Sequence, residues 1–250
     1  MARTSGGGVP VVLLHAFPLD AAMFDPLHDA GVPGVRLVTP DLAGFGASDV
    51  PEAEPDLAVL AGDVVALLDE LGLDRAVVGG VSMGGYVAQA VLRIAPVRVA
   101  GLVLVATRAT ADGAEAKERR LAMANRVLAE ATAAAAVQGV ANLHAPDAPA
   151  ELVARAEALA RRQRPEAVAW VQRAMAARPD SGEVLRTRPL PAVVVAGEHD
   201  RVVARAESVA LADLLATPLV VVPRAGHLVP WEEPAEFAAV LAEAAPRLAD

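Results

Sequence analysis

Short apolar segments alternate with longer amphipathic segments along most of the chain. The short segments are rich in β-branched residues and bounded by Gly, Pro or Asp, which is typical of strands buried on both faces. They are Val9–Leu14, Val35–Thr39, Arg75–Val81, Val99–Val105, Ala192–Ala196 and Leu219–Val222. Apolar residues at helical spacing predict helices over Leu57–Leu71, Met83–Ile94, Ala204–Leu215 and Pro234–Leu248. The alternation predicts an α/β fold, a mostly parallel sheet of about six strands flanked by helices.

One connection, from Arg108 to Pro189, interrupts this alternation because no segment of it is typical of a strand. It is too long for a plain loop, and its composition predicts helices near Ala114–Ala136, Ala150–Arg162 and Glu166–Arg178. We expect it to form a helical cap over one end of the sheet. The predicted division is a core of residues 1–107 and 190–250, and a cap of residues 108–189.

The cap is expected to fold over the strand ends and to roof an apolar pocket. Its helices carry more large apolar residues than exposed helices need. These residues include Leu121, Val127, Leu128, Leu143, Leu152, Leu159 and Trp170. We expect some of them to pack on the core and the others to line the pocket.

Composition narrows the classes of function. The chain is 54% hydrophobic and 21% charged, as in globular proteins. It has no cysteine, which excludes disulfides, thiolate zinc sites and a cysteine nucleophile. A net charge of −9 argues against a nucleic-acid partner. With no apolar run near the ~18 residues of a membrane span and no signal-peptide pattern, we expect a cytoplasmic protein that does not bind membranes.

Candidate chemistry lies where predicted strands end, because open α/β sheets bind ligands at the carboxyl ends of their strands. The segment Gly80–Gly84 has the pattern G-x-S-x-G between a strand and a helix, the setting of a nucleophilic serine on a strained turn. Gly80 and Gly84 remove side chains that would collide with the turn. The alternative is that Ser82 only caps the helix, but a cap needs no flanking glycines.

A base and an acid follow the last two predicted strands. His227 follows Leu219–Val222, and its ordinary pKa near ~6.5 suits a general base. Asp200 follows the preceding strand and would orient the imidazole. Glu198 is a rival acid. An acid after the strand ending near Val105 is the other possibility, but no carboxylate comes there before Asp112.

Backbone N–H groups of Phe17 and Met83 are the candidates for an oxyanion hole, one after the first strand and one after the nucleophile. Phe17 is also a candidate for the pocket wall. Trp170 and His144 are further candidates for substrate contact. Metal-ligand spacing, a G-x-G-x-x-G motif and a P-loop are all missing, so we expect no metal and no cofactor.

These motifs resemble the α/β-hydrolase superfamily, specifically its small cofactor-free esterase and lactonase branch, which includes 3-oxoadipate enol-lactonases. The matching segments are His15–Pro18, Asp41–Ser48, Gly80–Gly85, Gly197–Asp200 and Gly226–His227. The resemblance implies loop-fixing roles for His15, Asp41 and Ser48. The chain departs from the family at Ala16, where glycine is usual. Few residues precede Val9, so the antiparallel strands that often begin this fold are expected to be missing.

The leading hypothesis is a serine hydrolase that cleaves a small, mostly hydrophobic carboxylic ester or lactone through an acyl-enzyme on Ser82. A cofactor-free perhydrolase (haloperoxidase), a thioesterase or a C–C bond hydrolase would use the same residues. Dehalogenases and epoxide hydrolases are disfavoured because they place Asp where Ser82 stands. A non-catalytic binding protein of the same fold is the alternative of another class.

Overall fold

The computed structural model describes residues 2–249, which form a seven-stranded sheet. The strand order is β1-β3-β2-β4-β5-β6-β7. The strands are β1 (Ala2–Gly6), β2 (Val9–Leu14), β3 (Val35–Pro40), β4 (Ala76–Val81), β5 (Val99–Val105), β6 (Ala192–Gly197) and β7 (Leu219–Val222). All neighbouring pairs from β3 to β7 are parallel, so the expected α/β fold with a mostly parallel sheet is confirmed.

Strand β1 corrects one expectation, because the chain does open with an antiparallel strand. Ala2 pairs with Pro40 and Gly6 with Arg36, which places β1 at the edge of the sheet beside β3. Its sequence, ARTSG, has no apolar run, and none of its residues is fully buried. An edge strand needs only one covered side and gains its hydrogen bonds from its neighbour. Hydrophobic patterning therefore could not reveal β1.

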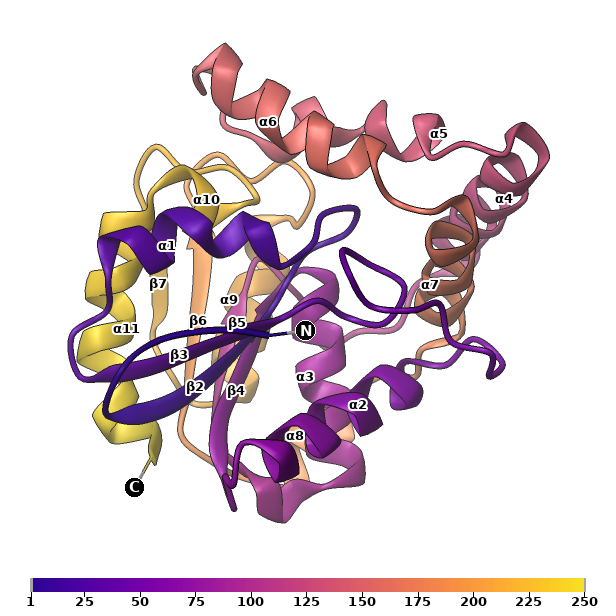
Figure 1. Cartoon of the computed structure of the whole chain (residues 1–250). Helices are drawn as coiled ribbons and strands as arrows, with labels where there is room; N and C mark the ends of the chain where they lie inside the picture. The colour runs from indigo at the N-terminus through magenta and orange to yellow at the C-terminus, as the bar shows by residue number, and fades with distance from the viewer. Residues whose placement is uncertain (1, 250) are drawn as a thin grey trace.

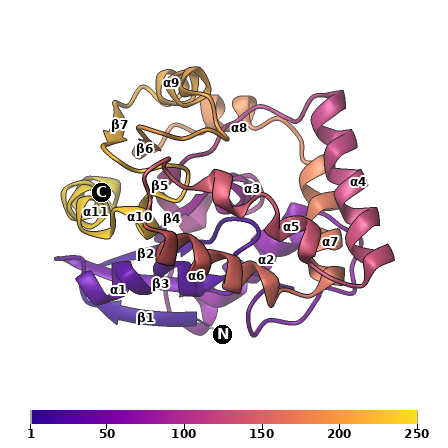
Figure 2. The ribbon, with the colours of Figure 1, turned by 90° about the horizontal axis from the view of Figure 1, so that it is seen from above.

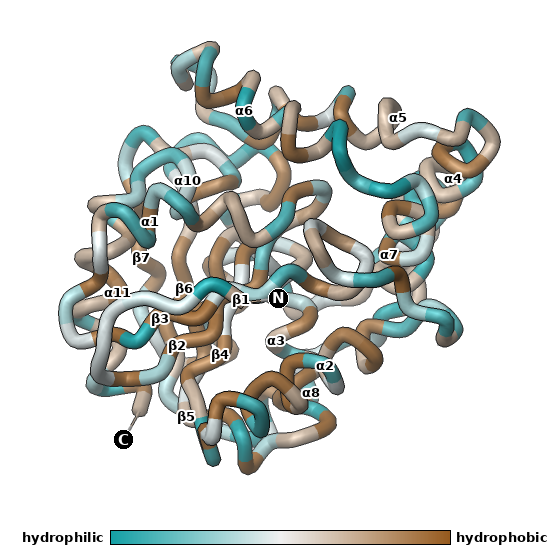
Figure 3. Tube along the Cα trace, in the orientation of Figure 1, coloured by the Kyte–Doolittle hydropathy of each residue, from teal (hydrophilic) through white to brown (hydrophobic). Residues whose placement is uncertain are grey.

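Helices cover both faces of the sheet (Figures 1 and 2). In β2, Val11 and Leu13 belong to one buried cluster, whereas Val12 and Leu14 belong to the other. This alternation follows from the two-residue repeat of a strand. One face is covered by α1 (Asp25–Ala30) and α11 (Pro234–Ala249). The other is covered by α2 (Leu57–Glu70), α3 (Met83–Ile94) and α9 (Arg205–Leu214). Figure 3 shows the hydrophobic character of the central strands.

Residues 108–189 form helices between β5 and β6. Figure 1 shows α4 to α7 spread over one end of the sheet. The helices are α4 (Ala114–Glu130), α5 (Ala134–Val137), α6 (Ala150–Arg161), α7 (Pro165–Ala177) and α8 (Gly182–Thr187), with a 3-10 turn, η3, at Val140–Leu143. The helix expected over Ala114–Ala136 is wrong at its end. Ala131 takes a left-handed conformation (φ 49°) and separates α4 from α5.

Residues 108–189, the insertion, pack on the core at two places and have a small buried cluster of their own. Trp170 and Val171 of α7 join the buried cluster of α2 and α3. Ala156 and Ala160 of α6 join the cluster on the opposite face. Its own cluster lies mainly between α4 and α7 and includes Val127.

Two apolar residues of α4 remain largely exposed. Leu121 and Leu128 are 44% and 39% exposed and belong to none of the three buried clusters. They lie seven residues apart, two helical turns, and so occupy one face of the helix.

Three short helical segments complete the fold: η1 (Ala21–Phe24), η2 (Pro96–Arg98) and α10 (Val229–Glu232). None of the helices formed by residues 2–249 combines the length and the apolarity needed to cross a bilayer.

Candidate active site

Ser82 lies on the sharp turn between β4 and α3. Its backbone has φ 53° and ψ −109°, a conformation that non-glycine residues rarely adopt. Its N–H donates to the carbonyl of Val105 at 2.8 Å. A side chain at Gly80 would collide with the backbone of Gly84, and one at Gly84 would collide with the carbonyl of Leu14. The Ser82 side chain makes no capping hydrogen bond to α3, which argues against a purely structural capping role.

Thr107 supports this turn from the end of the neighbouring strand β5. Its Oγ1 donates to the carbonyl of Ser82 at 2.9 Å. A side chain at Gly85 would collide with the Thr107 side chain, so the two residues are tightly packed. Sequence reasoning passed over Thr107. Its only signal was its position at the end of a strand.

His227 and Asp200 meet at the ends of β7 and β6. Nδ1 of His227 lies 3.1 Å from Oδ1 and 3.0 Å from Oδ2 of Asp200, and the side chains are 1% and 3% exposed. Oδ1 also accepts from the N–H groups of Val202 and Val203. Burial opposes ionisation, but the hydrogen bond and charge of His227, with the two N–H groups, outweigh it and lower the pKa of Asp200.

The rival acids are engaged elsewhere. Glu198 has a half-exposed side chain and accepts from the Arg224 N–H at 3.2 Å. Asp112 is fully buried but pairs with Arg108, Arg120 and Arg178. Asp200 is therefore the carboxylate that the fold brings to His227.

The hydroxyl of Ser82 is not hydrogen-bonded to His227 in the described chain. Ser82, Asp200 and His227 all follow parallel strands, β4, β6 and β7, and so share the carboxyl edge of the sheet. Unliganded sites often have loose contacts between nucleophile and base that tighten with substrate. The structure joins the predicted base and acid directly and places the predicted nucleophile at the same edge.

The two N–H groups predicted for an oxyanion hole are free to donate. Met83 is the first residue of α3, so its N–H has no acceptor within the helix. The Phe17 N–H has no partner among residues 2–249. The ring of Phe17 contacts Phe45 edge-on, 6.5 Å between centroids, and packs on both the core and the insertion.

His15, Asp41 and Ser48 fix loops, as the resemblance implied. Nε2 of the buried His15 accepts from the Leu42 N–H at 3.1 Å. Burial lowers the pKa of His15, so its ring is neutral at pH 7. Asp41 accepts from two backbone N–H groups. Ser48 Oγ donates to the carbonyl of Asp41 at 2.8 Å.

Trp170 and His144, the candidate substrate contacts from the insertion, are both buried. Trp170 is 7% exposed, and its indole N–H donates to the carbonyl of Ala53 at 2.7 Å. His144 is 1% exposed, and its Nδ1 lies 3.0 Å from the carbonyl of Val140. The polar atoms committed to these bonds are not free to contact substrate in this conformation.

The loop that carries His227 touches the insertion. The N–H of His227 donates to the carbonyl of Leu143 at 2.8 Å. A side chain at Gly226 would collide with the backbone of His144 and Ala145. Sequence reasoning missed this contact, because a backbone carbonyl leaves no signal in residue identity.

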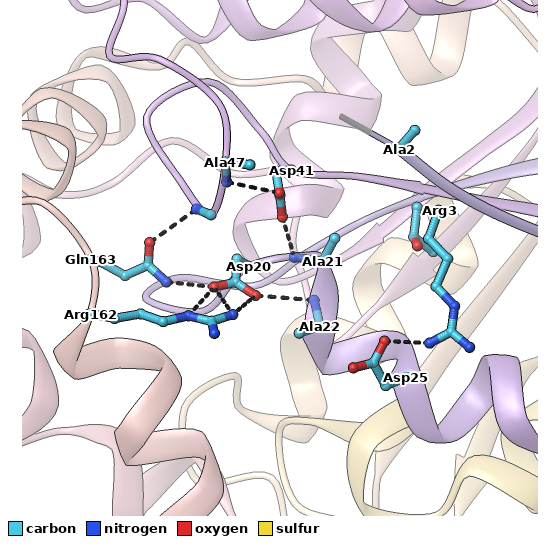
Figure 4. Close-up of a pocket in the computed structure, with 12 residues that line it drawn as sticks. Ala2, Arg3, Asp20, Ala21, Ala22, Asp25, Asp41, Ala47, Arg162 and Gln163 are labelled. Carbon is cyan, nitrogen blue, oxygen red and sulfur yellow. Dashed lines mark hydrogen bonds and ion pairs between the residues drawn. The ribbon is translucent and has the colours of Figure 1, made fainter.

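A separate cavity of about 540 Å³ lies beside η1 and the loop after β3 (Figure 4). Asp20 accepts two hydrogen bonds from Nη2 of Arg162, at 2.8 and 2.9 Å, and one from Gln163 at 2.8 Å. Asp41 is satisfied by backbone N–H groups. The bonds from Arg162 and Gln163 to Asp20 tie the insertion to the core beside this cavity. Ser82 does not line the cavity.

Comparison with known proteins identifies the family to which the chain belongs. The model of the Alpha/beta hydrolase family matches residues 11–240. The chain belongs to the α/β-hydrolase family. A thermophilic esterase from Thermogutta terrifontis, solved with malate bound, shares the whole fold with a TM-score of 0.94. It is 34% identical, and the match covers 100% of this chain and 94% of that one.

Two further proteins share the fold or a part of the sequence. The enol-lactonase from Burkholderia xenovorans LB400 has a TM-score of 0.81 at 24% identity, over 97% of this chain and 95% of its own, and shows the same fold. A non-heme chloroperoxidase from Streptomyces lividans is 41% identical over 105 residues, 39% of this chain and 36% of its own. The matched segment spans about a third or less of the curated relatives' length. Together these matches confirm the resemblance to the α/β-hydrolase superfamily, with similarity to an esterase along the whole chain.

Proposed function

We propose that the chain is a serine hydrolase that cleaves a small, mostly hydrophobic carboxylic ester or lactone. The observation that carries this proposal is the buried His227–Asp200 pair at the carboxyl edge where the strained Ser82 also lies. Strain at a single non-glycine residue is costly and persists where the surrounding structure enforces it, often at functional sites. Similarity to an esterase along the whole chain supports the same reaction class.

In the proposed reaction, Ser82 Oγ attacks the ester carbonyl carbon while Nε2 of His227 takes its proton. The tetrahedral oxyanion accepts from the Phe17 and Met83 N–H groups, and the N-terminal end of α3 favours its charge. The intermediate collapses, and the alcohol leaves with the proton from His227. Water then attacks the acyl-enzyme by the same route, releasing the acid and restoring Ser82. No cofactor is required.

The preference for a hydrophobic substrate is supported by the surroundings of the Phe17 loop. Phe17, like Met123, packs against the apolar cluster that lies mainly between α4 and α7. We propose that residues 108–189 act as a cap that roofs the site, so that water is excluded while substrate is bound. Trp170 and His144 would shape this roof from within.

The decisive experiment uses a fluorophosphonate probe that reacts with activated serines. Mass spectrometry should find the probe on Ser82. Ser82→Ala should remove both labelling and hydrolysis of p-nitrophenyl esters, by up to about 10⁶-fold in kcat. Activity of Ser82→Ala within about tenfold of wild type would sink the proposal, since a lost nucleophile costs far more.

A second candidate is a perhydrolase, and the similarity to a non-heme chloroperoxidase favours it. The acyl-enzyme would form in the same way, but hydrogen peroxide would attack its carbonyl. The products are then a peracid and free Ser82. Measuring peracid and carboxylic acid from one ester in the presence of peroxide separates the two functions.

A further inference from the structure

Glu232, the last residue of α10, lies beside the loop that carries His227. Its Oε1 accepts hydrogen bonds from the N–H groups of Gly226 at 3.0 Å and Leu228 at 3.1 Å, the two residues that flank His227. Its Oε2 accepts from the N–H of Ala145 in the insertion at 2.7 Å. One carboxylate therefore holds the histidine loop on both sides and joins it to the insertion.

This bonding differs from that of the adjacent glutamate. Glu233 pairs with the guanidinium of Arg224, an exposed side chain, at 3.0 Å. Surface pairs of that kind contribute little and leave the backbone free. Glu232 instead uses both oxygens on three backbone donors. Hydrogen bonds to an ionised acceptor are roughly twice as strong as neutral ones, and three of them fix the backbone in place.

The insertion adds contacts around the same point. Leu143 accepts from the backbone of His227, as described above. Arg201, next to Asp200 in the chain, donates to the carbonyl of His144 at 3.0 Å. The guanidinium of Arg155 on α6 lies 4.9 Å from the ring of Trp231. Glu232 thus sits at the junction of α10, the histidine loop and the insertion.

The position of this loop matters because Asp200 orients the imidazole ring but does not place it. In the proposed reaction the ring must meet Ser82, so the position of the backbone at residues 226–228 decides whether it can. A misplacement of about 1 Å can cost a reaction about 10²-fold in rate. We propose that Glu232 is a positioning residue, which holds the loop where His227 can act on Ser82. This inference rests on the proposed function, in which His227 is the base.

The test compares the full-length variants Glu232→Ala and Glu233→Ala with the wild type. The readouts are the rate of fluorophosphonate labelling at Ser82, and kcat and KM for a p-nitrophenyl ester per folded molecule, measured well below Tm. For Glu232→Ala, labelling and kcat should fall together by about 10- to 100-fold while KM stays within about threefold. Glu233→Ala should stay within about twofold of wild type, because it loses only a surface pair.

A purely structural role would lower Tm but leave the labelling rate per folded molecule unchanged, and that result would overturn the inference. If Glu232→Ala does not fold, Glu232→Gln replaces it. Its amide nitrogen must face either Ala145 or the histidine loop, donor against donor, so labelling should still fall by more than about threefold. A labelling rate for this variant equal to wild type would also overturn the inference. Failure of the wild type itself to label at Ser82 would instead defeat the proposed function.

Discussion

Nδ1 of His227 lies 3.0 Å from Oδ2 of Asp200, and each side chain is almost completely buried. The carboxylate is not held by the histidine alone, since Val202 and Val203 also donate to its Oδ1. The two N–H groups therefore fix the orientation of the Asp200 carboxylate independently of the imidazole. The proton on Nδ1 points to the carboxylate, and Nε2 is left as the acceptor for the Ser82 proton.

Asp200→Asn should lower kcat by about 10³- to 10⁴-fold without unfolding the protein. The asparagine oxygen can still accept from the Val202 and Val203 N–H groups. Its NH₂ then faces Nδ1, which must become the acceptor, so the proton moves to Nε2 and blocks the base. Steady-state kinetics and circular dichroism check both parts.

Glu198→Gln is the matched control, and its kcat should stay near that of the wild type because Glu198 does not contact His227. The assignment of the acid fails if Glu198→Gln does the damage and Asp200→Asn does little.

The pH profile should report His227. In the wild type, kcat/KM should fall on the acid side, because a protonated imidazole cannot take the proton of Ser82. The pKa of Asp200 is lowered below that of an ordinary carboxyl, so Asp200 stays ionised near neutral pH and does not cause the fall. The carboxylate stabilises the imidazolium, so its neutralisation in Asp200→Asn should move the acid limb to lower pH. An unmoved limb in that variant would mean that another group titrates.

The central strands were predictable because they are buried on both faces, and the predicted segments Val9–Leu14 and Val99–Val105 coincide with β2 and β5. Leu219–Val222 coincides with the edge strand β7, which is only partly buried but has an apolar, β-branched sequence. Met83–Ile94 coincides with α3, because the turn at Ser82 gives the helix a sharp beginning. Triad candidates were predictable for a related reason. Chemistry gathers where parallel strands end, so position along the chain restricts the choices to a few residues.

Other features depend on contacts that residue identity does not encode. Glu232 and Glu233 are the same residue type side by side, yet only Glu232 bonds to the backbone on both sides of His227. An alanine run favours helix by propensity, but Ala131 breaks it in a left-handed turn. Replacing the whole insertion with a linker, an experiment natural from the sequence, would remove Trp170 and Val171 and expose the core residues that they cover. Point substitutions are therefore the better probes.

Gly84→Ala should abolish activity and destabilise the fold. The new methyl group would collide with the carbonyl of Leu14 in β2, at the centre of the sheet, where neither backbone can move freely.

Gly62→Ala is the control, because Gly62 lies on the exposed side of α2 and an added methyl group there would meet nothing within 4 Å. That variant should gain about 0.5–1 kcal/mol in helix stability and keep its activity. Urea unfolding and ester hydrolysis of both variants check the contrast. Equal behaviour of the two would contradict the packing at the nucleophile turn.

Asp112 joins the two ends of the insertion to each other. Its fully buried carboxylate accepts from Arg108 at 2.7 Å and from Arg178 at 3.0 Å, residues close to the beginning and the end of the insertion. Arg120 of α4 is the third partner. Burial favours the neutral acid, but the hydrogen bonds and charges of the three arginines outweigh it and lower the pKa of Asp112 to about 2.

Asp112→Asn should therefore destabilise the protein by about 3–5 kcal/mol at pH 7, the cost of removing one partner from a buried ion pair. The folded-state pKa lies below the ordinary value of 3.8, so folding favours the ionised form. That stability is fully present above the ordinary pKa and is lost as the pH falls toward about 2. Wild type and variant should differ by a constant amount near neutral pH, and the difference should narrow between about pH 4 and pH 2. Urea titrations across this range measure the difference.

Glu115→Gln is the control, because it breaks an exposed pair on α4 and should change stability by less than about 1 kcal/mol at any pH. A difference between wild type and Asp112→Asn that is the same at about pH 3 and pH 7 would show that the carboxylate charge does not hold the insertion in place.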